Sequence, residues 1–160
     1  MDLILWRHAE AEPGTPDIAR ALTKKGTRQA ARMARWLKPY LPKNVKILVS
    51  PARRAQETAQ ALGMAYETLE ELAPGKEPQD ILAAIGWPAA SSTVIVVGHS
   101  PALGQIAALL LTGTIADWDI KKGGVWWFAN GGNSEEPQEE EPQTVLLAAM
   151  SPKLLKDNPP

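Results

Sequence analysis

Short apolar runs alternate with helical patterns along most of the chain. Residues 3–7 form one such run, residues 46–50 form a second, and residues 93–97 form a third in which every residue is β-branched. A run without polar alternation is typical of a strand that is covered on both faces of a sheet. Strands that alternate with helices predict an α/β fold built on a mostly parallel sheet.

Helical spacing of small and apolar residues marks the segments between these runs. Thr23 is placed to cap a helix that ends near residue 38, and residues 79–85 predict a short helix. Two more helices are expected to start at Ser-Pro pairs, residues 50–51 and 100–101, because serine is a favoured N-cap and proline suits the first helical position. Glycines are expected to end these two helices, at Gly63 and Gly113.

The pattern changes after Gly113. Residues 125–129 and 144–150 read as two late strands joined by a hairpin, and residues 65–69 as a short additional strand. The fold class predicted is therefore a three-layer α/β/α sandwich, with a mostly parallel central sheet and antiparallel C-terminal strands. A length of 160 residues suits one domain, so we expect a single domain over residues 1–160.

The segment that joins the two late strands, residues 130–143, is rich in glutamate and contains no basic residue. Such a composition cannot build a core. We expect a mobile, solvated hairpin loop here. A docking tail for a basic partner is the alternative interpretation.

Composition narrows the function classes. The net charge is −1, which favours neither nucleic-acid nor membrane binding. No apolar run reaches the length of a membrane span, and no basic segment precedes the first apolar run, so a cytoplasmic protein is expected. The chain has two histidines and no cysteine, which argues against a dedicated metal site. No cofactor is expected.

Both histidines follow strand-like runs. His8 comes directly after Arg7 at the end of the first run, and His99 follows the strongest run by one glycine. Ligands of parallel sheets bind beyond the carboxyl ends of the strands, where Arg53 and Arg54 are also expected. Arginine forks and helix N-termini both favour an anion. The sequence therefore predicts a pocket for phosphate.

Four segments together resemble the histidine phosphatase superfamily, the phosphoglycerate-mutase-like enzymes. Residues 7–9 are similar to the family's Arg-His-Gly, residues 22–30 to its Leu-Thr-x-x-Gly-x-x-Gln-Ala, and residues 50–58 to its Ser-x-x-x-Arg-Ala-x-x-Thr. Residues 97–99 are similar to the segment of the second family histidine. The short chain and its ending most resemble the small phosphohistidine phosphatases of the SixA type.

The resemblance implies a role for each matching residue. His8 corresponds to the nucleophile that becomes phosphorylated, and Arg7 and Arg54 correspond to phosphate-binding arginines. His99 corresponds to the second pocket histidine, which contacts the transferring phosphoryl group. Arg53 stands where the family does not require arginine, and we interpret it as a rim contact with substrate.

Two positions depart from the family pattern. Ala9 replaces the usual glycine, which a negative backbone φ would tolerate. The family's general acid is usually a glutamate between the second arginine and the second histidine. Glu71 is the best positional match, with Glu70 as its adjacent rival.

The implied activity is a metal-independent phosphatase that forms a phospho-His8 intermediate. Neighbouring arginines should lower the pKa of His8, and a backbone carbonyl should orient its other nitrogen. A phosphorylated imidazole leaves easily once protonated, so an ill-defined acid fits a phosphohistidine substrate better than an ester. The short chain between Arg54 and His99 leaves little room for a capping insertion. The expected partner is a phosphohistidine-containing protein, such as a phosphotransfer domain, or a small phosphate ester.

Other functions are weighed against this one. Residues 98–102 nearly match a serine-hydrolase elbow, but that fold needs a histidine after the serine and none follows His99. A broad phosphomonoesterase and a non-catalytic phosphate-binding module both remain open. An aromatic cluster reads as core packing rather than as a ligand platform; its members are Trp6, Trp126, Trp127 and Phe128.

Overall fold

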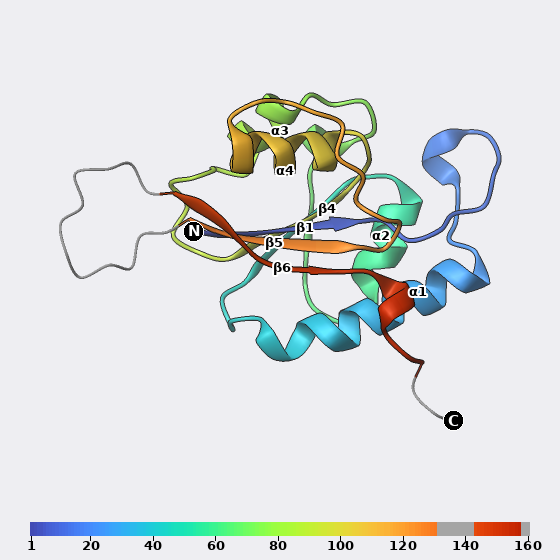
Figure 1. The fold of residues 1–160 in the computed structure, drawn as a ribbon. Helices are drawn as coiled ribbons and strands as arrows, with labels where there is room; N and C mark the ends of the chain where they lie inside the picture. The colour runs from blue at the N-terminus through green and yellow to red at the C-terminus, as the bar shows by residue number, and fades with distance from the viewer. Residues whose placement is uncertain (131–142, 158–160) are drawn as a thin grey trace.

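The computed structural model describes residues 1–130 and 143–157, which are built on one six-stranded sheet (Figure 1). Its strands lie in the order β3-β2-β4-β1-β5-β6. The first four are parallel to their neighbours, whereas β5 runs antiparallel to β1 and β6 runs antiparallel to β5. The strands are β1 Asp2–Arg7, β2 Lys46–Val49, β3 Glu67–Thr68, β4 Val94–Gly98, β5 Val125–Asn130 and β6 Thr144–Met150.

Helices cover both faces of this sheet, which confirms the predicted three-layer α/β/α sandwich (Figure 1). Along β1, Leu3 and Leu5 pack with α3 and α4, while Ile4 and Trp6 pack with α1 and α2. The α-helices are α1 Lys24–Leu37, α2 Arg53–Gln60, α3 Pro78–Ala84 and α4 Ala102–Thr112. The 3₁₀ segments are η1 Asp17–Ala19, η2 Lys38–Tyr40, η3 Glu70–Leu72 and η4 Pro152–Leu154.

The register of the three central strands positions the candidate site. Arg7, the last residue of β1, lies opposite Gly98, the last residue of β4. The next residues, His8 and His99, therefore leave the sheet side by side. Ser50 follows β2, and its amide donates to a carbonyl of β4 at 3.0 Å. Three consecutive strand ends thus deliver three polar side chains to one edge.

Two predicted helix caps are wrong. The helices α2 and α4 begin later than expected, with Ala52 and Pro101 at their N-cap positions and no side-chain cap on either. The chain makes a further turn after each strand, so the serines lie too early to cap the first helical turn. Ser50 instead bonds His99. The Ser100 hydroxyl is buried and has no partner among the described residues.

Two other predicted termini are confirmed, whereas α2 ends at Gln60, before the predicted Gly63. The Thr23 hydroxyl accepts from the amide of Gly26 and caps α1 at 2.9 Å. Gly113 ends α4 in the left-handed conformation, with φ 76°. The strand predicted over residues 65–69 is shorter than expected. It corresponds to β3, which consists of two exposed residues that pair only with β2.

Two glycines permit close packing. A Cβ at Gly26 would overlap the carbonyl of Glu10, and a Cβ at Gly104 would overlap the carbonyl of Trp118. The first contact fixes the loop that follows β1 against α1. The second holds the segment before β5 against α4. Any larger side chain would have to push the backbone apart.

The aromatic residues of the sheet are mostly packed, as expected. Trp6 and Phe128 are fully buried, and Trp126 and Trp127 are partly buried. The predicted acidic loop lies almost entirely outside the described residues, which stop at Asn130 and resume at residue 143. Within the part of the chain that is described, no helix is long and apolar enough to span a membrane.

Candidate active site

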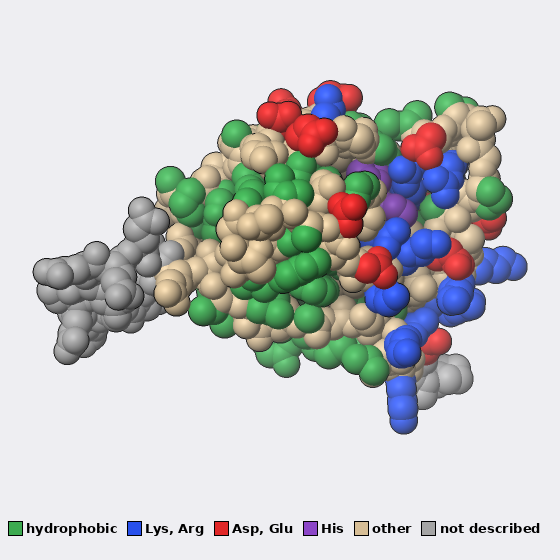
Figure 2. All heavy atoms as spheres, turned by 45° about the horizontal axis from the view of Figure 1, so that its top comes forward, with side chains coloured by type: hydrophobic (Ala, Val, Ile, Leu, Met, Phe, Trp, Pro, Cys, Tyr) green, Lys and Arg blue, Asp and Glu red, His purple; other side chains and the backbone are tan. Residues whose placement is uncertain are grey.

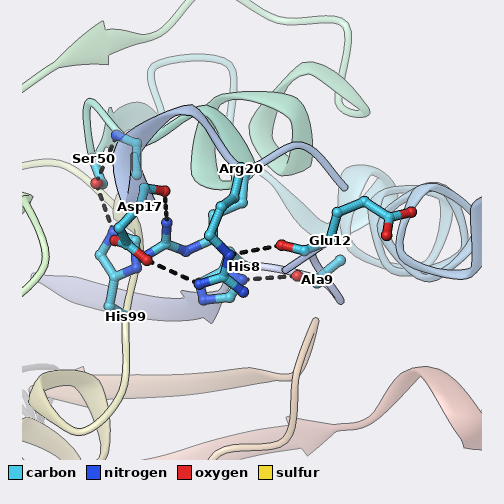
Figure 3. A network of polar contacts seen from close by, with 9 residues as sticks. His8, Ala9, Glu12, Asp17, Arg20, Ser50 and His99 are labelled. Atoms are coloured by element: carbon cyan, nitrogen blue, oxygen red, sulfur yellow. Dashed lines mark hydrogen bonds and ion pairs between the residues drawn. The ribbon is translucent and has the colours of Figure 1, made fainter. Parts of the chain in front are cut away.

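His8 stands at the end of β1 with its imidazole held by the backbone. Its Nδ1 lies 2.8 Å from the carbonyl oxygen of Ala9 (Figure 3). A carbonyl only accepts hydrogen bonds, so Nδ1 is the protonated nitrogen and Nε2 keeps its lone pair. The side chain is 9% exposed. The backbone carbonyl that was predicted to orient His8 is therefore that of Ala9.

Ala9 accommodates its methyl group without strain. None of the described non-glycine residues has a positive φ, so a glycine is not required at this position. The amide of Ala9 donates to the hydroxyl of Thr58 at 3.0 Å, and that hydroxyl donates to the carbonyl of Arg54 at 2.7 Å. Helix α2 thereby fixes the turn that orients His8.

His99 faces His8 across the pocket. The two ring centroids are 5.2 Å apart and the planes are inclined by 52°. The Nε2 of His99 lies 2.7 Å from the hydroxyl of Ser50, which is fully buried (Figure 3). The other nitrogen, Nδ1, is buried and has no protein partner among the described residues. This imidazole is therefore held at one nitrogen only.

Both histidines are neutral at physiological pH. Burial, together with the positive charges of Arg54, Arg7 and Arg20, lowers the pKa of His8 to about 4, although the Ala9 carbonyl acts in the opposite direction. Burial lowers the pKa of His99 to about 3, with further contributions from His8 and the arginines. A neutral imidazole is the form that can attack phosphorus.

Arg54 enters the pocket from the first turn of α2 and is only 5% exposed. Its Nη1 donates to the backbone oxygen of Asp17 at 2.9 Å, and its Nη2 contacts the carboxylate of Asp17 at 3.1 Å. Arg20 donates to the other oxygen of that carboxylate at 2.9 Å and to the carbonyl of Glu12 at 2.7 Å (Figure 3). These two arginines lower the pKa of Asp17.

Arg7 approaches from the other side, at the end of β1. Its Nη1 donates to the carbonyl of Ile120 at 2.8 Å and lies 3.5 Å from the carboxylate of Asp119. The Nε atoms of Arg7 and Arg54 are buried and have no partner among the described residues. Both guanidinium groups thus retain buried donors, which suits an anion.

Two predicted residues lie outside this cluster. Arg53 pairs with Glu57 at 3.5 Å on the surface of α2, with its side chain 59% exposed. Glu71 is exposed in η3 and makes no hydrogen bond or ion pair within the described residues. A cleft of about 140 Å³ beside His99 is lined by Glu77 but not by Glu71. The assignment of Glu71 as the general acid therefore stays a prediction.

Comparisons with known proteins identify the family of this chain. The profile of the histidine phosphatase superfamily, branch 1, matches residues 3–75. A phosphohistidine phosphatase SixA homolog of Haemophilus influenzae is 36% identical over 127 residues, which is 69% of this chain and 77% of that protein. The chain belongs to the histidine phosphatase superfamily.

Further relatives extend the match. Phosphohistidine phosphatase SixA of Escherichia coli is 32% identical over 124 residues, which is 71% of this chain and 76% of that protein. The solved structure of the protein histidine phosphatase SixA complexed with tungstate has a TM-score of 0.79 and 24% identity, and the match covers 96% of this chain and 99% of that chain. Family and fold are thus confirmed.

This histidine phosphatase brings four of the predicted residues into one cluster, namely Arg7, His8, Arg54 and His99. Reasoning from sequence missed the polar groups around them. Ser50 and Thr58 lie inside the matched motif over residues 50–58, so the motif itself was the signal that could have marked these two hydroxyls. Asp17 and Arg20 lie in a loop without periodicity, which gave no signal.

The residues described, 1–130 and 143–157, contain no group of three or more histidine, cysteine or acidic side chains that could hold an ion.

Proposed function

We propose that this chain hydrolyses phosphohistidine on a protein through a covalent phospho-His8 intermediate. The observation that carries the proposal is the bond between Nδ1 of His8 and the carbonyl of Ala9, which leaves Nε2 as the nucleophile. The SixA relatives bear the name phosphohistidine phosphatase, which supports the same substrate class.

In the first step, Nε2 of His8 attacks the phosphorus and a new P–N bond forms. The P–N bond of the substrate breaks, and its electron pair goes to the substrate imidazole, which takes up a proton from solvent. Phosphorylation makes His8 an imidazolium whose Nδ1–H still donates to Ala9. The carbonyl therefore stabilises the intermediate.

Charge on the transferring group is stabilised by position. Arg7 and Arg54 supply buried N–H donors, and His99 contributes one imidazole nitrogen. Preorganised donors of this kind are the main protein contribution to phosphoryl transfer. In the second step, water attacks phosphorus, the bond to His8 breaks, and its electron pair returns to Nε2 as phosphate leaves and the water proton passes to solvent.

The leaving group favours phosphohistidine over an ester. An alkoxide needs a strong acid beside it, whereas a protonated imidazole leaves readily. Glu71 remains our candidate for that acid, and its exposed position in η3 suits an assisting role only. Arg53 is proposed as a rim contact. We propose a phosphotransfer domain or similar cytoplasmic protein as the partner, with no metal or other cofactor.

Trapping tests the nucleophile. After rapid mixing with a radiolabelled phosphohistidine protein and an alkaline quench, label should reside on His8, and His8→Ala should carry none and turn nothing over. Label on serine would contradict the mechanism. Binding of substrate without phosphate release would favour the non-catalytic module.

A second measurement tests the substrate class. The kcat/KM for a phosphohistidine protein should exceed that for small phosphate esters by orders of magnitude. The reverse preference would assign the chain to the broad phosphomonoesterases.

A further inference from the structure

A basic groove adjoins the candidate active site. It has a volume of about 600 Å³ and includes Arg7, whose guanidinium also belongs to the phosphate pocket. Its lining comes from the start of α1, the loop before β5 and η4. The charged side chains that line it are Arg7, Lys25, Lys121, Lys122 and Lys153, with Glu10 and Asp119 as the two carboxylates.

Both carboxylates of the groove have partners within the protein. Asp119 pairs with Lys121 at 3.0 Å and lies 3.5 Å from Arg7. Glu10 accepts from the hydroxyl of Thr23 at 2.8 Å. The negative charge of Asp119 is therefore offset by its cationic neighbours, and the five cationic side chains of the groove outnumber its two carboxylates.

The ammonium groups of Lys25, Lys122 and Lys153 carry the surplus charge. All three residues are exposed, and none has an ion-pair partner within residues 1–130 and 143–157. The whole chain has a net charge of −1, so positive charge is concentrated locally at this edge. Figure 2 shows Lys and Arg side chains gathered around the two histidines.

We propose that this groove docks an acidic surface of the phosphorylated protein substrate. A phosphohistidine that enters the pocket brings the flanking surface of its protein over the groove, because Arg7 lines both. Leu154, which is 68% exposed at the groove, offers that surface an apolar contact. The inference rests on the proposed phosphohistidine phosphatase function and adds the recognition of its partner.

Charge reversal tests the groove. The substrate is a histidine-phosphorylated phosphotransfer domain with acidic flanking residues. On this domain, the triple variant Lys25→Glu, Lys122→Glu, Lys153→Glu should lower kcat/KM by about tenfold or more, because complementary charges raise association rates. The same variant should retain its turnover of free phosphohistidine. The matched control is Lys38→Glu, Lys43→Glu, Lys46→Glu, which reverses three exposed lysines outside the groove.

Reciprocal changes and salt sharpen the test. Lysines in place of the flanking acids of the substrate domain should restore turnover by the triple variant. The kcat/KM of the wild-type enzyme on the acidic domain should fall as ionic strength rises, because surface charges are screened over about 10 Å at 0.1 M salt. The triple variant should show a much flatter salt dependence.

Unchanged turnover of the acidic domain by the triple variant would overturn the docking groove and leave the proposed function standing. Equal losses on the domain and on free phosphohistidine would also overturn it, since the lysines would then act on the pocket. Tighter binding of duplex DNA than of the domain would assign the groove to nucleic acid. If the wild-type enzyme hydrolyses neither phosphohistidine substrate, the proposed function and the groove both fall.

Discussion

The hydroxyl of Ser50 orients the imidazole of His99. It is fully buried and lies 2.7 Å from Nε2 of His99. A buried hydrogen bond of this kind fixes the orientation of the ring. The motif places a serine at this position, yet its role follows only from the alignment of β2 beside β4.

Ser50→Ala should lower kcat by about tenfold, the effect expected from a lost buried hydrogen bond, with a smaller change in KM. The matched control is Ser100→Ala, because the Ser100 hydroxyl is also buried beside His99 but has no partner among the described residues. That control should stay within about twofold of wild type. Steady-state kinetics on a phosphohistidine protein measure both variants, and equal losses would show that Ser50 does not position His99.

Adjacent arginines on α2 should differ sharply. Arg54→Ala should reduce kcat/KM by about 10²–10³, because it removes a buried donor from the developing charge. Arg53→Ala should stay within a few-fold of wild type, since this side chain is 59% exposed and pairs with Glu57. The same steady-state assay distinguishes them, and comparable losses would mean that Arg53 also reaches the phosphoryl group.

Strand and helix patterns predicted most elements because burial dictates their periodicity. The long apolar run over residues 93–97 became β4, and the helical spacing after Thr23 became α1. The Ser-Pro signals failed because the chain makes a further turn between each strand and the helix that follows, so neither serine lies at an N-cap position. Contacts that join distant segments, such as Asp17 to Arg54, have no periodic trace in the sequence.

Helix α4 depends on a close backbone approach. Gly104→Ala should destabilise the protein by about 3 kcal/mol, because its Cβ would overlap the carbonyl of Trp118. Gly98→Ala is the matched control, since a Cβ there meets only Leu103 side-chain atoms at 3.6 Å or more. Urea unfolding measures both free energies. A loss no larger for Gly104→Ala than for Gly98→Ala would contradict this packing.

At the level of the whole molecule, two buried neutral histidines make the fold sensitive to acid. Their pKa values of about 4 and about 3 lie below the ordinary 6.5, so the unfolded chain binds more protons below pH 6.5. The free energy of unfolding should therefore fall as the pH drops from 6.5 toward 4, on the order of 3 kcal/mol for His8 alone.

Calorimetry across this pH range measures the loss of stability, and NMR of the two imidazoles checks its cause. Neither ring should titrate between pH 5.5 and 8. The double variant His8→Gln, His99→Gln should lose this part of the acid dependence, whereas the lowered pKa of Asp17 acts only below its ordinary 3.8. A titration of either ring near pH 6.5 would contradict the assignment.

The last residue of β5 and the first residue of β6 lie at the end of the sheet far from the histidines. Asn130 pairs with Thr144, and the adjacent Ala129 lies opposite Asp2 at the start of β1, whereas His8 follows Arg7 at the other end of that strand. A reporter protein grafted between these two strands would thus be carried away from the catalytic edge. This junction offers a place to immobilise or label the enzyme while its substrate face stays open.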